Sequence, residues 1–318
     1  MRQPALPNFF IAGTGKAGTT SLYHYLQQHP QIYMSPIKEP CYFASEIRVE
    51  NLTASHLRHV RWMSRSLPEC LKEGESVKPS AWLVSEWENY LKLFEAVQSE
   101  TAIGEASVGY LWSETAAANI ASRIPDARIV LILRDPSERA FSQYLHQLTV
   151  GLTHSTFREH IAKCMQNRER KISAYYPLLE VGLYCRQVQR YLELFPRNNI
   201  RIYWYEEAWK DPSGFLEDLF TFLTVDSKFP VNTSHNRLQR RAPRIAAMNY
   251  AVKRFRITDR ARELSPSWLR STARTLLFRN GQNLKMSSSD RQYLVDYYRE
   301  DILNLASLLN RDLSAWLV

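Results

Sequence analysis

The sequence predicts an α/β fold in which helices flank a mostly parallel central sheet and a helical part follows. Short apolar runs alternate with segments of helical periodicity, which is the order expected of strand–helix–strand units. The run over 127–133 (A-R-I-V-L-I-L) is almost uniformly apolar, as is usual for a parallel strand covered on both faces. We therefore expect one domain over 1–318, with a core over 8–225, a basic loop over 232–244 and a helical part over 245–318.

The individual elements follow from the apolar periodicity and from the glycines and prolines between them. Strands are expected over 9–12, 101–104, 127–133 and 200–205. Helices are expected over 19–28, 82–98, 113–123, 136–150, 155–170, 184–195, 212–223 and 288–309. The helix over 136–150 has the best-specified start, because Asp135 is a fitting N-cap, Pro136 suits the first turn and Glu138 completes a capping box.

Net charge and cysteine usage limit the class of protein. The chain carries a net charge of +9, which favours anionic ligands such as nucleotides, acidic glycans or nucleic acid. No apolar run reaches the length of a transmembrane helix, and the few residues before the first strand leave no room for a signal peptide. Four cysteines without a C-x-x-C pair indicate reduced thiols in a cytoplasmic protein. The histidines show no metal-ligand spacing either, so we expect no metal.

A glycine-rich loop joins the first strand to the first helix. Gly13, Gly15 and Gly18 allow a positive φ and a close approach of the backbone to a ligand, and Lys16 adds a mobile positive charge. Backbone amides and the dipole of the helix that begins near Thr19 face the same loop. The stretch therefore predicts a phosphate loop on a P-loop-like sheet.

The spacing of this loop matches neither common nucleotide pattern. In a Walker A loop the lysine directly follows the second glycine, but Gly18 is followed by Thr19, and Lys16 comes two residues too early. The candidate for a Walker B aspartate, Asp135, is followed at once by proline. A G-x-G-x-x-G pattern fits by spacing, but the acidic residue expected at the end of a second strand about 20 residues later is missing.

Polar residues follow three of the expected strands. Lys16, Glu105 and Arg134 each come at the carboxyl end of a strand, and ligands of parallel α/β sheets bind at that edge. We therefore expect these three side chains around one site.

Two motifs in this region resemble those of a known family. Residues 15–22 (G-K-A-G-T-T-S-L) resemble the 5′-phosphosulfate loop of sulfotransferases that use 3′-phosphoadenosine 5′-phosphosulfate (PAPS). Residues 134–144 (R-D-P-S-E-R-A-F-S-Q-Y) resemble the 3′-phosphate motif of these enzymes. The segments 38–40 and 105–110 are similar to the heparan sulfate branch and its bacterial relatives, and the segment 298–317 is also family-like. The resemblance thus runs nearly from end to end.

This resemblance implies PAPS as the co-substrate, 3′-phosphoadenosine 5′-phosphate (PAP) as the product, and no metal. It implies that Arg134 and Ser142 hold the 3′-phosphate. The 5′-phosphosulfate would be held by Gly15, Lys16, Ala17, Gly18, Thr19, Thr20 and Ser21. The basic loop lacks the Lys-Gly-Arg of heparan-type enzymes, and Arg241 is the residue expected to contact the cofactor there.

The same resemblance suggests the catalytic groups. Fixed positive charge should do most of the work in sulfonate transfer, as it does in phosphoryl transfer, so Lys16 would stabilise the leaving group of an in-line displacement. Glu105 is expected to be the general base, because the heparan-type branch places a glutamate there. Lys38 would steady the sulfonate or keep Glu105 ionised, and His146 is a rival base.

The acceptor and two competing functions stay open at this point. The motifs and the charge favour a hydroxyl or amine of a saccharide, with a small natural product or a lipid-linked sugar as the alternative. An ATP-dependent P-loop kinase and a non-catalytic polyanion-binding module are the alternatives of other classes. No aromatic–basic nucleic-acid motif is present, so we expect no nucleic-acid partner. The sequence leaves the oligomeric state open.

Overall fold

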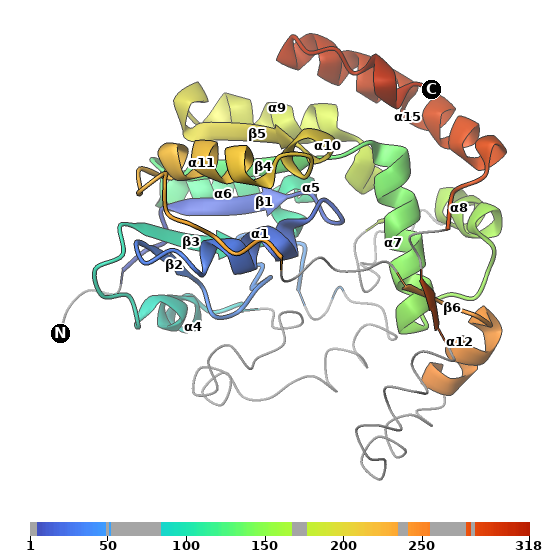
Figure 1. Ribbon diagram of the computed structural model, residues 1–318, viewed down its shortest axis with the longest axis horizontal. Helices are drawn as coiled ribbons and strands as arrows, with labels where there is room; N and C mark the ends of the chain where they lie inside the picture. Colours follow the sequence, from blue (N-terminus) through green and yellow to red (C-terminus); the bar gives the residue numbers. More distant parts are fainter. Residues whose placement is uncertain are drawn as a thin grey trace.

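A five-stranded parallel sheet forms the centre of the molecule, with helices on both faces (Figure 1). The computed structural model describes residues 5–48, 51, 84–166, 177–234, 241–254, 278–280 and 284–318. The strands are β1 (Phe9–Gly13), β2 (Ile32–Met34), β3 (Ala102–Ala106), β4 (Arg128–Leu133) and β5 (Ile200–Trp204). Their order in the sheet is β2-β3-β1-β4-β5, which confirms the predicted α/β class.

The predicted strands are confirmed to within two residues, with two corrections. The short apolar run Ile32–Met34, which we did not predict as a strand, forms β2 at the edge of the sheet beside β3. The strand predicted over 101–104 continues to Ala106. Glu105 therefore lies inside β3 rather than after it, and its backbone is paired with Phe10 of β1.

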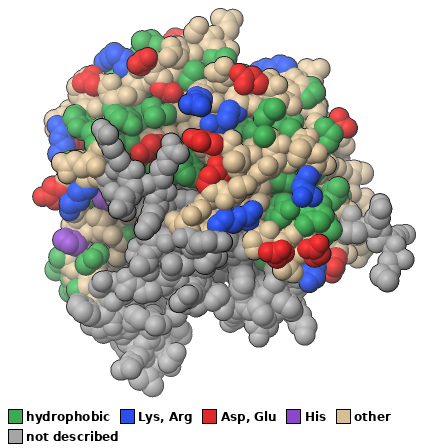
Figure 2. Space-filling model, turned by 180° about the vertical axis from the view of Figure 1, so that it is seen from behind, with side chains coloured by type: hydrophobic (Ala, Val, Ile, Leu, Met, Phe, Trp, Pro, Cys, Tyr) green, Lys and Arg blue, Asp and Glu red, His purple; other side chains and the backbone are tan. Residues whose placement is uncertain are grey.

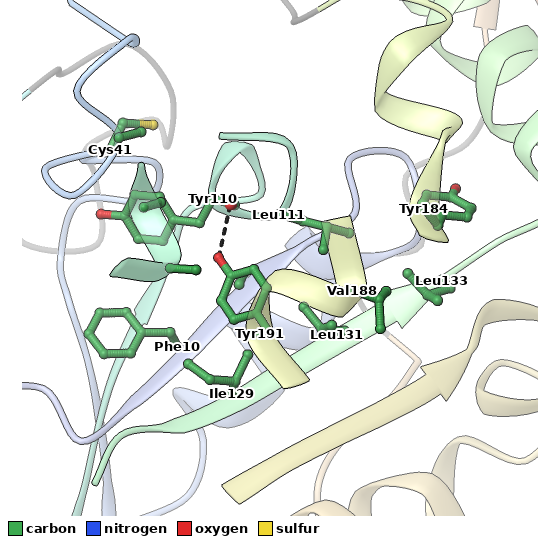
Figure 3. Close-up of a cluster of buried hydrophobic side chains, with 14 of the residues drawn as sticks. Phe10, Cys41, Tyr110, Leu111, Ile129, Leu131, Leu133, Tyr184, Val188 and Tyr191 are labelled. Carbon is green, nitrogen blue, oxygen red and sulfur yellow. Dashed lines mark hydrogen bonds between the residues drawn. The ribbon is translucent and has the colours of Figure 1, made fainter. Parts of the chain in front are cut away.

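The two faces of the sheet bury separate hydrophobic clusters, because successive side chains of a strand point to opposite faces. One face packs against α1 (Thr19–Leu26) and α11 (Pro212–Leu223). The opposite face packs against α5 (Gly109–Trp112), α6 (Ala116–Arg123) and α9 (Tyr184–Leu194). Figure 3 shows part of this second cluster, in which four side chains of the sheet meet four from α5 and α9: Phe10, Ile129, Leu131, Leu133, Leu111, Tyr184, Val188 and Tyr191.

Most of the remaining helices agree with the predicted ranges, but the helix Tyr205–Ala208 was not predicted and the helix over 82–98 differs. These helices include α7 (Pro136–Val150), α8 (Phe157–Gln166), α10 (Tyr205–Ala208), α12 (Ala246–Arg254) and α15 (Ser288–Leu309). The helix predicted over 82–98 is shorter than expected: α4 (Trp87–Leu91) continues only as a 3₁₀ segment (Lys92–Phe94). Within the described part of the chain, no helix is both long enough and apolar enough to cross a membrane.

The start of α7 confirms the predicted N-cap. The Oδ1 atom of Asp135 accepts hydrogen bonds from the amides of Ser137 (2.8 Å) and Glu138 (3.2 Å). The amide of Asp135, which the predicted capping box would pair with Glu138, donates instead to Oε1 of Glu206 at 3.4 Å, and the carboxylate of Glu138 accepts from Arg134. Asp135 therefore connects the end of β4 to both α7 and α10.

The C-terminal part is not wholly helical, contrary to our prediction for 245–318. Phe278–Asn280 forms strand β7, which pairs antiparallel with β6 (Arg241–Pro243) from the end of the predicted basic loop. Three residues are too few to show the alternation of apolar and polar side chains that predicts a strand. Strands this short are defined by the segment with which they pair, and their own sequence does not predict them. Residues 235–240 of the loop and residues 52–83 lie outside the described residues.

Gly104→Ala is expected to destabilise the fold, because a methyl group at this position of β3 has no space. A Cβ atom there would lie 2.6 Å from Cε1 of Phe9 and 2.7 Å from Sδ of Met34, both buried. Overpacking of this kind costs about 1–3 kcal/mol, which urea denaturation would measure. Gly15→Ala is the control, since its Cβ would meet Val108 at 3.5 Å. Equal unfolding midpoints for the two variants would contradict the prediction.

Candidate functional site

The loops that follow β1, β3 and β4 meet at one edge of the sheet, as predicted. These strands are neighbours, so their carboxyl ends lie side by side. Nη1 of Arg134, after β4, donates to the backbone oxygen of Lys16, after β1, at 2.9 Å. The amide of Ser107, after β3, donates to the backbone oxygen of Ile11 in β1 at 3.2 Å. Hydrogen bonds therefore connect the three strand ends directly.

The glycine loop is shaped to hold an anion at the start of α1. Gly18, the N-cap, is left-handed (φ 81°), and a Cβ atom on it would lie 2.5 Å from Cε2 of Trp209. Trp209 also donates from Nε1 to the backbone oxygen of Ala17 at 3.2 Å. The first turn of α1 holds no acidic residue and receives no side-chain cap, and the first amides of a helix lack acceptors within the helix. An anion at this position would complete the helix start.

Arg134 is held from several sides and is almost completely buried, with 4% of its surface exposed. Its guanidinium contacts Glu138 and lies over the ring of Tyr205, 4.4 Å from the ring centroid. The hydroxyl of Tyr184 donates to the backbone oxygen of Arg134 at 2.9 Å. Ser142 lies two turns along α7, also buried. Arg134 thus has a defined orientation beside the glycine loop.

Glu105 is enclosed by hydroxyl groups. Ser107 donates to its Oε1 atom at 2.5 Å, and Tyr90 and Tyr110 donate to its Oε2 atom at 2.8 and 3.0 Å. The residue has 0% exposure. Burial raises the pKa of Glu105 to about 7, although the three hydrogen bonds act in the opposite direction. Burial also raises the pKa of both tyrosines well above the usual value.

Glu39 is a second carboxylate at the same edge, and it is less enclosed. Its Oε1 atom pairs with Nζ of Lys38, and its Oε2 atom accepts from the amide of Val108 at 2.8 Å. The side chain of Glu39 is 19% exposed. Its own amide donates to the backbone oxygen of Ala106 at 2.8 Å, which attaches the turn to the end of β3.

The backbone of the two loops is strained at non-glycine residues. Lys16 (φ 71°), Glu39 (φ 65°) and Cys41 (φ 55°) are all left-handed. Each such residue costs on the order of 1–3 kcal/mol, and strain of this kind gathers at functional sites. Lys16 and Glu39 thus adopt conformations that the surrounding contacts must maintain.

The structure brings most of the sequence-predicted site residues together, but the side chain of Arg241 lies outside the described residues. The structure brings together Gly15–Ser21, Arg134, Lys38 and Glu105 at one edge of the sheet. Lys38 contacts Glu39 rather than Glu105 in the described contacts. Sequence reasoning assigned Glu39 no role, although its position directly after Lys38 in the Lys-Glu-Pro motif was an available signal. Arg241 has its backbone in β6, and its side chain lies outside the described part of the chain.

Two further observations concern charge and metals. On the face seen in Figure 2, Lys and Arg side chains are dispersed among acidic and apolar ones and do not gather into one basic patch. His146, the rival base, is partly buried on α7. Among the residues that the structure describes, no group of three or more His, Cys, Asp or Glu side chains could hold a metal ion.

Comparisons with known proteins converge on one family. The model of the sulfotransferase family matches residues 7–229. Human carbohydrate sulfotransferase 15 is 25% identical over 99% of this chain and 55% of its own length. Human bifunctional heparan sulfate N-deacetylase/N-sulfotransferase 3 is 28% identical over 69% of this chain and 22% of its own length. This chain therefore spans about half, or less, of these two relatives.

A solved structure gives the same result at the level of the fold and of the sequence. The crystal structure of a sulfotransferase from Alicyclobacillus acidocaldarius aligns with a TM-score of 0.70 at 29% identity. The alignment covers 98% of this chain and 99% of the bacterial one. The likeness therefore extends across both the sheet and the C-terminal helices.

Glu105→Gln is expected to weaken the pH dependence of folding stability. In the unfolded chain the pKa of a glutamate is about 4.3. In the folded chain burial raises the pKa of Glu105 to about 7. The folded state therefore binds more protons between these values, so its stability falls as the pH rises through this window. Urea denaturation from about pH 4 to about pH 8 would measure this slope.

The matched control is Glu88→Gln, which changes an exposed glutamate on α4. Its stability should follow the wild-type pH curve. A Glu105→Gln curve parallel to wild type would contradict the raised pKa.

Proposed function

The chain belongs to the sulfotransferase family, and from this premise we propose that it transfers the sulfonate of PAPS to a hydroxyl or amine of a saccharide. The contact between Arg134 and the backbone of Lys16 is the main support. It joins two segments that are far apart in the sequence, and we assign these segments to the 3′-phosphate and the 5′-phosphosulfate of PAPS. The similarity to a carbohydrate sulfotransferase and to a heparan sulfate N-deacetylase/N-sulfotransferase supports a saccharide over a small natural product.

The residues at the strand ends suit the two phosphate-bearing ends of PAPS. PAPS supplies the sulfonate and leaves as PAP. The amides of the loop from Gly15 to Ser21 would hold the 5′-phosphate, and Gly18 adopts the left-handed turn of this loop at no steric cost because it has no side chain. Arg134 and Ser142 would hold the 3′-phosphate. Lys16 would place its positive charge where negative charge develops on the departing oxygen.

We propose that Glu39 takes the proton of the acceptor. A general base must come within hydrogen-bonding distance of the proton that it removes. Glu105 has no exposed surface and already accepts three hydroxyl hydrogen bonds. Glu39 is partly exposed, and Nζ of Lys38 lies beside its Oε1 atom.

Glu105 is then a positioning residue for the Glu39 turn. Its carboxylate binds the hydroxyl of Ser107, and the oxygen of that hydroxyl accepts the amide of Cys41 at 3.0 Å. Cys41 lies two residues after Glu39 and shares its left-handed backbone. This chain of hydrogen bonds connects the interior of the sheet to the strained turn. The alternative, in which Glu105 itself is the base, stays a prediction from the sequence.

The location in the cell also stays a proposal. Cys41, Cys164 and Cys185 are free thiols, as is usual in a reducing compartment. We propose a cytoplasmic enzyme on this basis.

The variants Glu39→Gln and Glu105→Gln should separate the two carboxylates. We expect Glu39→Gln to lower kcat about 10²- to 10⁴-fold, the usual contribution of a general base, with unchanged affinity for PAP. Glu105→Gln should lower kcat less and should also lower the unfolding midpoint. Release of PAP from PAPS with saccharide acceptors, followed by mass spectrometry, measures turnover.

Glu88→Gln serves again as the control, with turnover equal to wild type. If Glu105→Gln loses activity at unchanged stability while Glu39→Gln remains active, the base is Glu105.

Lys16→Met and Arg134→Met are expected to weaken the binding of PAP. Each removes a cation from the proposed phosphate contacts, and a hydrogen bond to a charged group contributes about 1.5–3 kcal/mol, or roughly 10- to 100-fold in affinity. Calorimetric titration with PAP would measure the loss. Lys92→Met, at an exposed lysine, is the control.

The wild-type titration also tests the proposal as a whole. Binding of magnesium-ATP in place of PAP would indicate a kinase. Indifference to PAP combined with salt-sensitive binding of heparin would indicate a polyanion-binding module.

A further inference from the structure

The C-terminal helix α15 contacts the turn that carries Arg134, although the two are far apart in the sequence. It packs against α7 and α9 and runs along the outside of these helices (Figure 1, red). Nη2 of Arg291, in its first turn, lies 2.8 Å from Oδ2 of Asp135. The side chain of Asp135 is 8% exposed and that of Arg291 26%. This ion pair is therefore largely shielded from solvent. Charge interactions are stronger in such a shielded environment than in water.

Arg291 completes the hydrogen bonding of Asp135. Oδ1 of this carboxylate accepts the amides that begin α7, and Oδ2 faces Arg291. Nε of Arg291 donates to the backbone oxygen of Val318, so the guanidinium is itself anchored. With both oxygens occupied, the orientation of the Asp135 carboxylate is determined. Asp135 directly follows Arg134, so its orientation also defines where Arg134 leaves β4.

Two further contacts connect α15 to the surroundings of Arg134. The carboxylate of Asp301 accepts the amide of Tyr184 at 2.7 Å, and Tyr184 in turn donates to the backbone oxygen of Arg134. Arg311, just after α15, pairs with Glu207 on α10, the helix that begins with the Tyr205 ring beneath Arg134. The backbone oxygen, the following residue and the stacking ring of Arg134 are thus all connected to this one segment.

We propose that Arg291 is a positioning residue that orients Arg134 toward the 3′-phosphate of the nucleotide. The inference depends on the proposed function, in which Arg134 holds that phosphate. A guanidinium presents its N–H groups in a rigid fork, so it binds a phosphate well only in the correct orientation. Binding is tighter when that orientation exists before the ligand arrives. Arg291 provides this order through Asp135, without contacting the ligand.

The test compares two ligands that differ at the 3′ position. Arg291→Ala is titrated with PAP and with adenosine 5′-monophosphate, which differs from PAP only in lacking the 3′-phosphate. We expect affinity for PAP to fall about 10-fold and affinity for adenosine 5′-monophosphate to stay at the wild-type value. A general structural role would weaken both ligands equally, and that result would overturn the inference. Unchanged affinity for PAP would also overturn it.

Arg299→Ala is the matched control on the same helix. Arg299 is 47% exposed and pairs with Asp296 at 3.3 Å, so both affinities should equal those of wild type.

A second variant separates orientation from charge and serves if Arg291→Ala does not fold. Arg291→Lys keeps the positive charge but loses the guanidinium fork that joins Asp135 to Val318. We expect it to remain weaker than wild type toward PAP. Full recovery of PAP affinity would show that charge alone suffices, which would overturn a positioning role.

A double-mutant cycle links the two arginines. In the Arg134→Met background, Arg291→Ala should cause no further loss of PAP affinity, because its effect passes through Arg134. Additive losses would overturn the inference. If Arg134→Met alone leaves PAP affinity unchanged, the proposed role of Arg134 fails instead, and the two failures are thereby distinguished.

Discussion

Phe10 of β1 is paired with Glu105 of β3 on one side and with Ile129 of β4 on the other, and the site depends on this parallel register. Parallel strands end at the same edge of a sheet, so the glycine loop, the end of β3 and Arg134 meet there without further adjustment. The flanking clusters bury both faces and hold the register, because a slip by one residue would turn every side chain to the opposite face. Glu105 would then leave its hydroxyl partners.

The polar groups beside this edge form two hydrogen-bonded networks. One runs from Glu105 through Ser107 to the backbone of Cys41 and supports the turn that carries Glu39. The other runs from Arg291 through Asp135 to the start of α7 and supports Arg134. Buried carboxylates without partners would be costly, and here each one has partners. In our proposal the groups that meet the ligands are held by others that do not, which is how sites gain precise geometry.

Much of the fold was predictable because local signals agree with the tertiary structure. The apolar run of β4 and the Asp-Pro start of α7 specify their elements without long-range information, and both were predicted to within a residue. β2 and β7 were not predicted as strands, since three residues are too few for a period and pairing alone defines them. The helix predicted over 82–98 was too long, although Trp87, Tyr90 and Phe94 do pack against one another at helical spacing.

The sequence by itself indicated the ligand chemistry of this protein through motifs that resemble those of PAPS-dependent sulfotransferases: a glycine loop with an early lysine, then Arg134 and Ser142 in the same order. That information resides in residue type and short spacing, which need no folded structure to be read. Only the tertiary structure distinguishes the two carboxylates, since Glu105 and Glu39 are alike in the sequence but unequally buried. The tertiary structure also brings Arg291 into contact with Asp135, which is 156 residues away in the sequence. Burial and pairing are set by contacts between distant segments, and no local pattern records them.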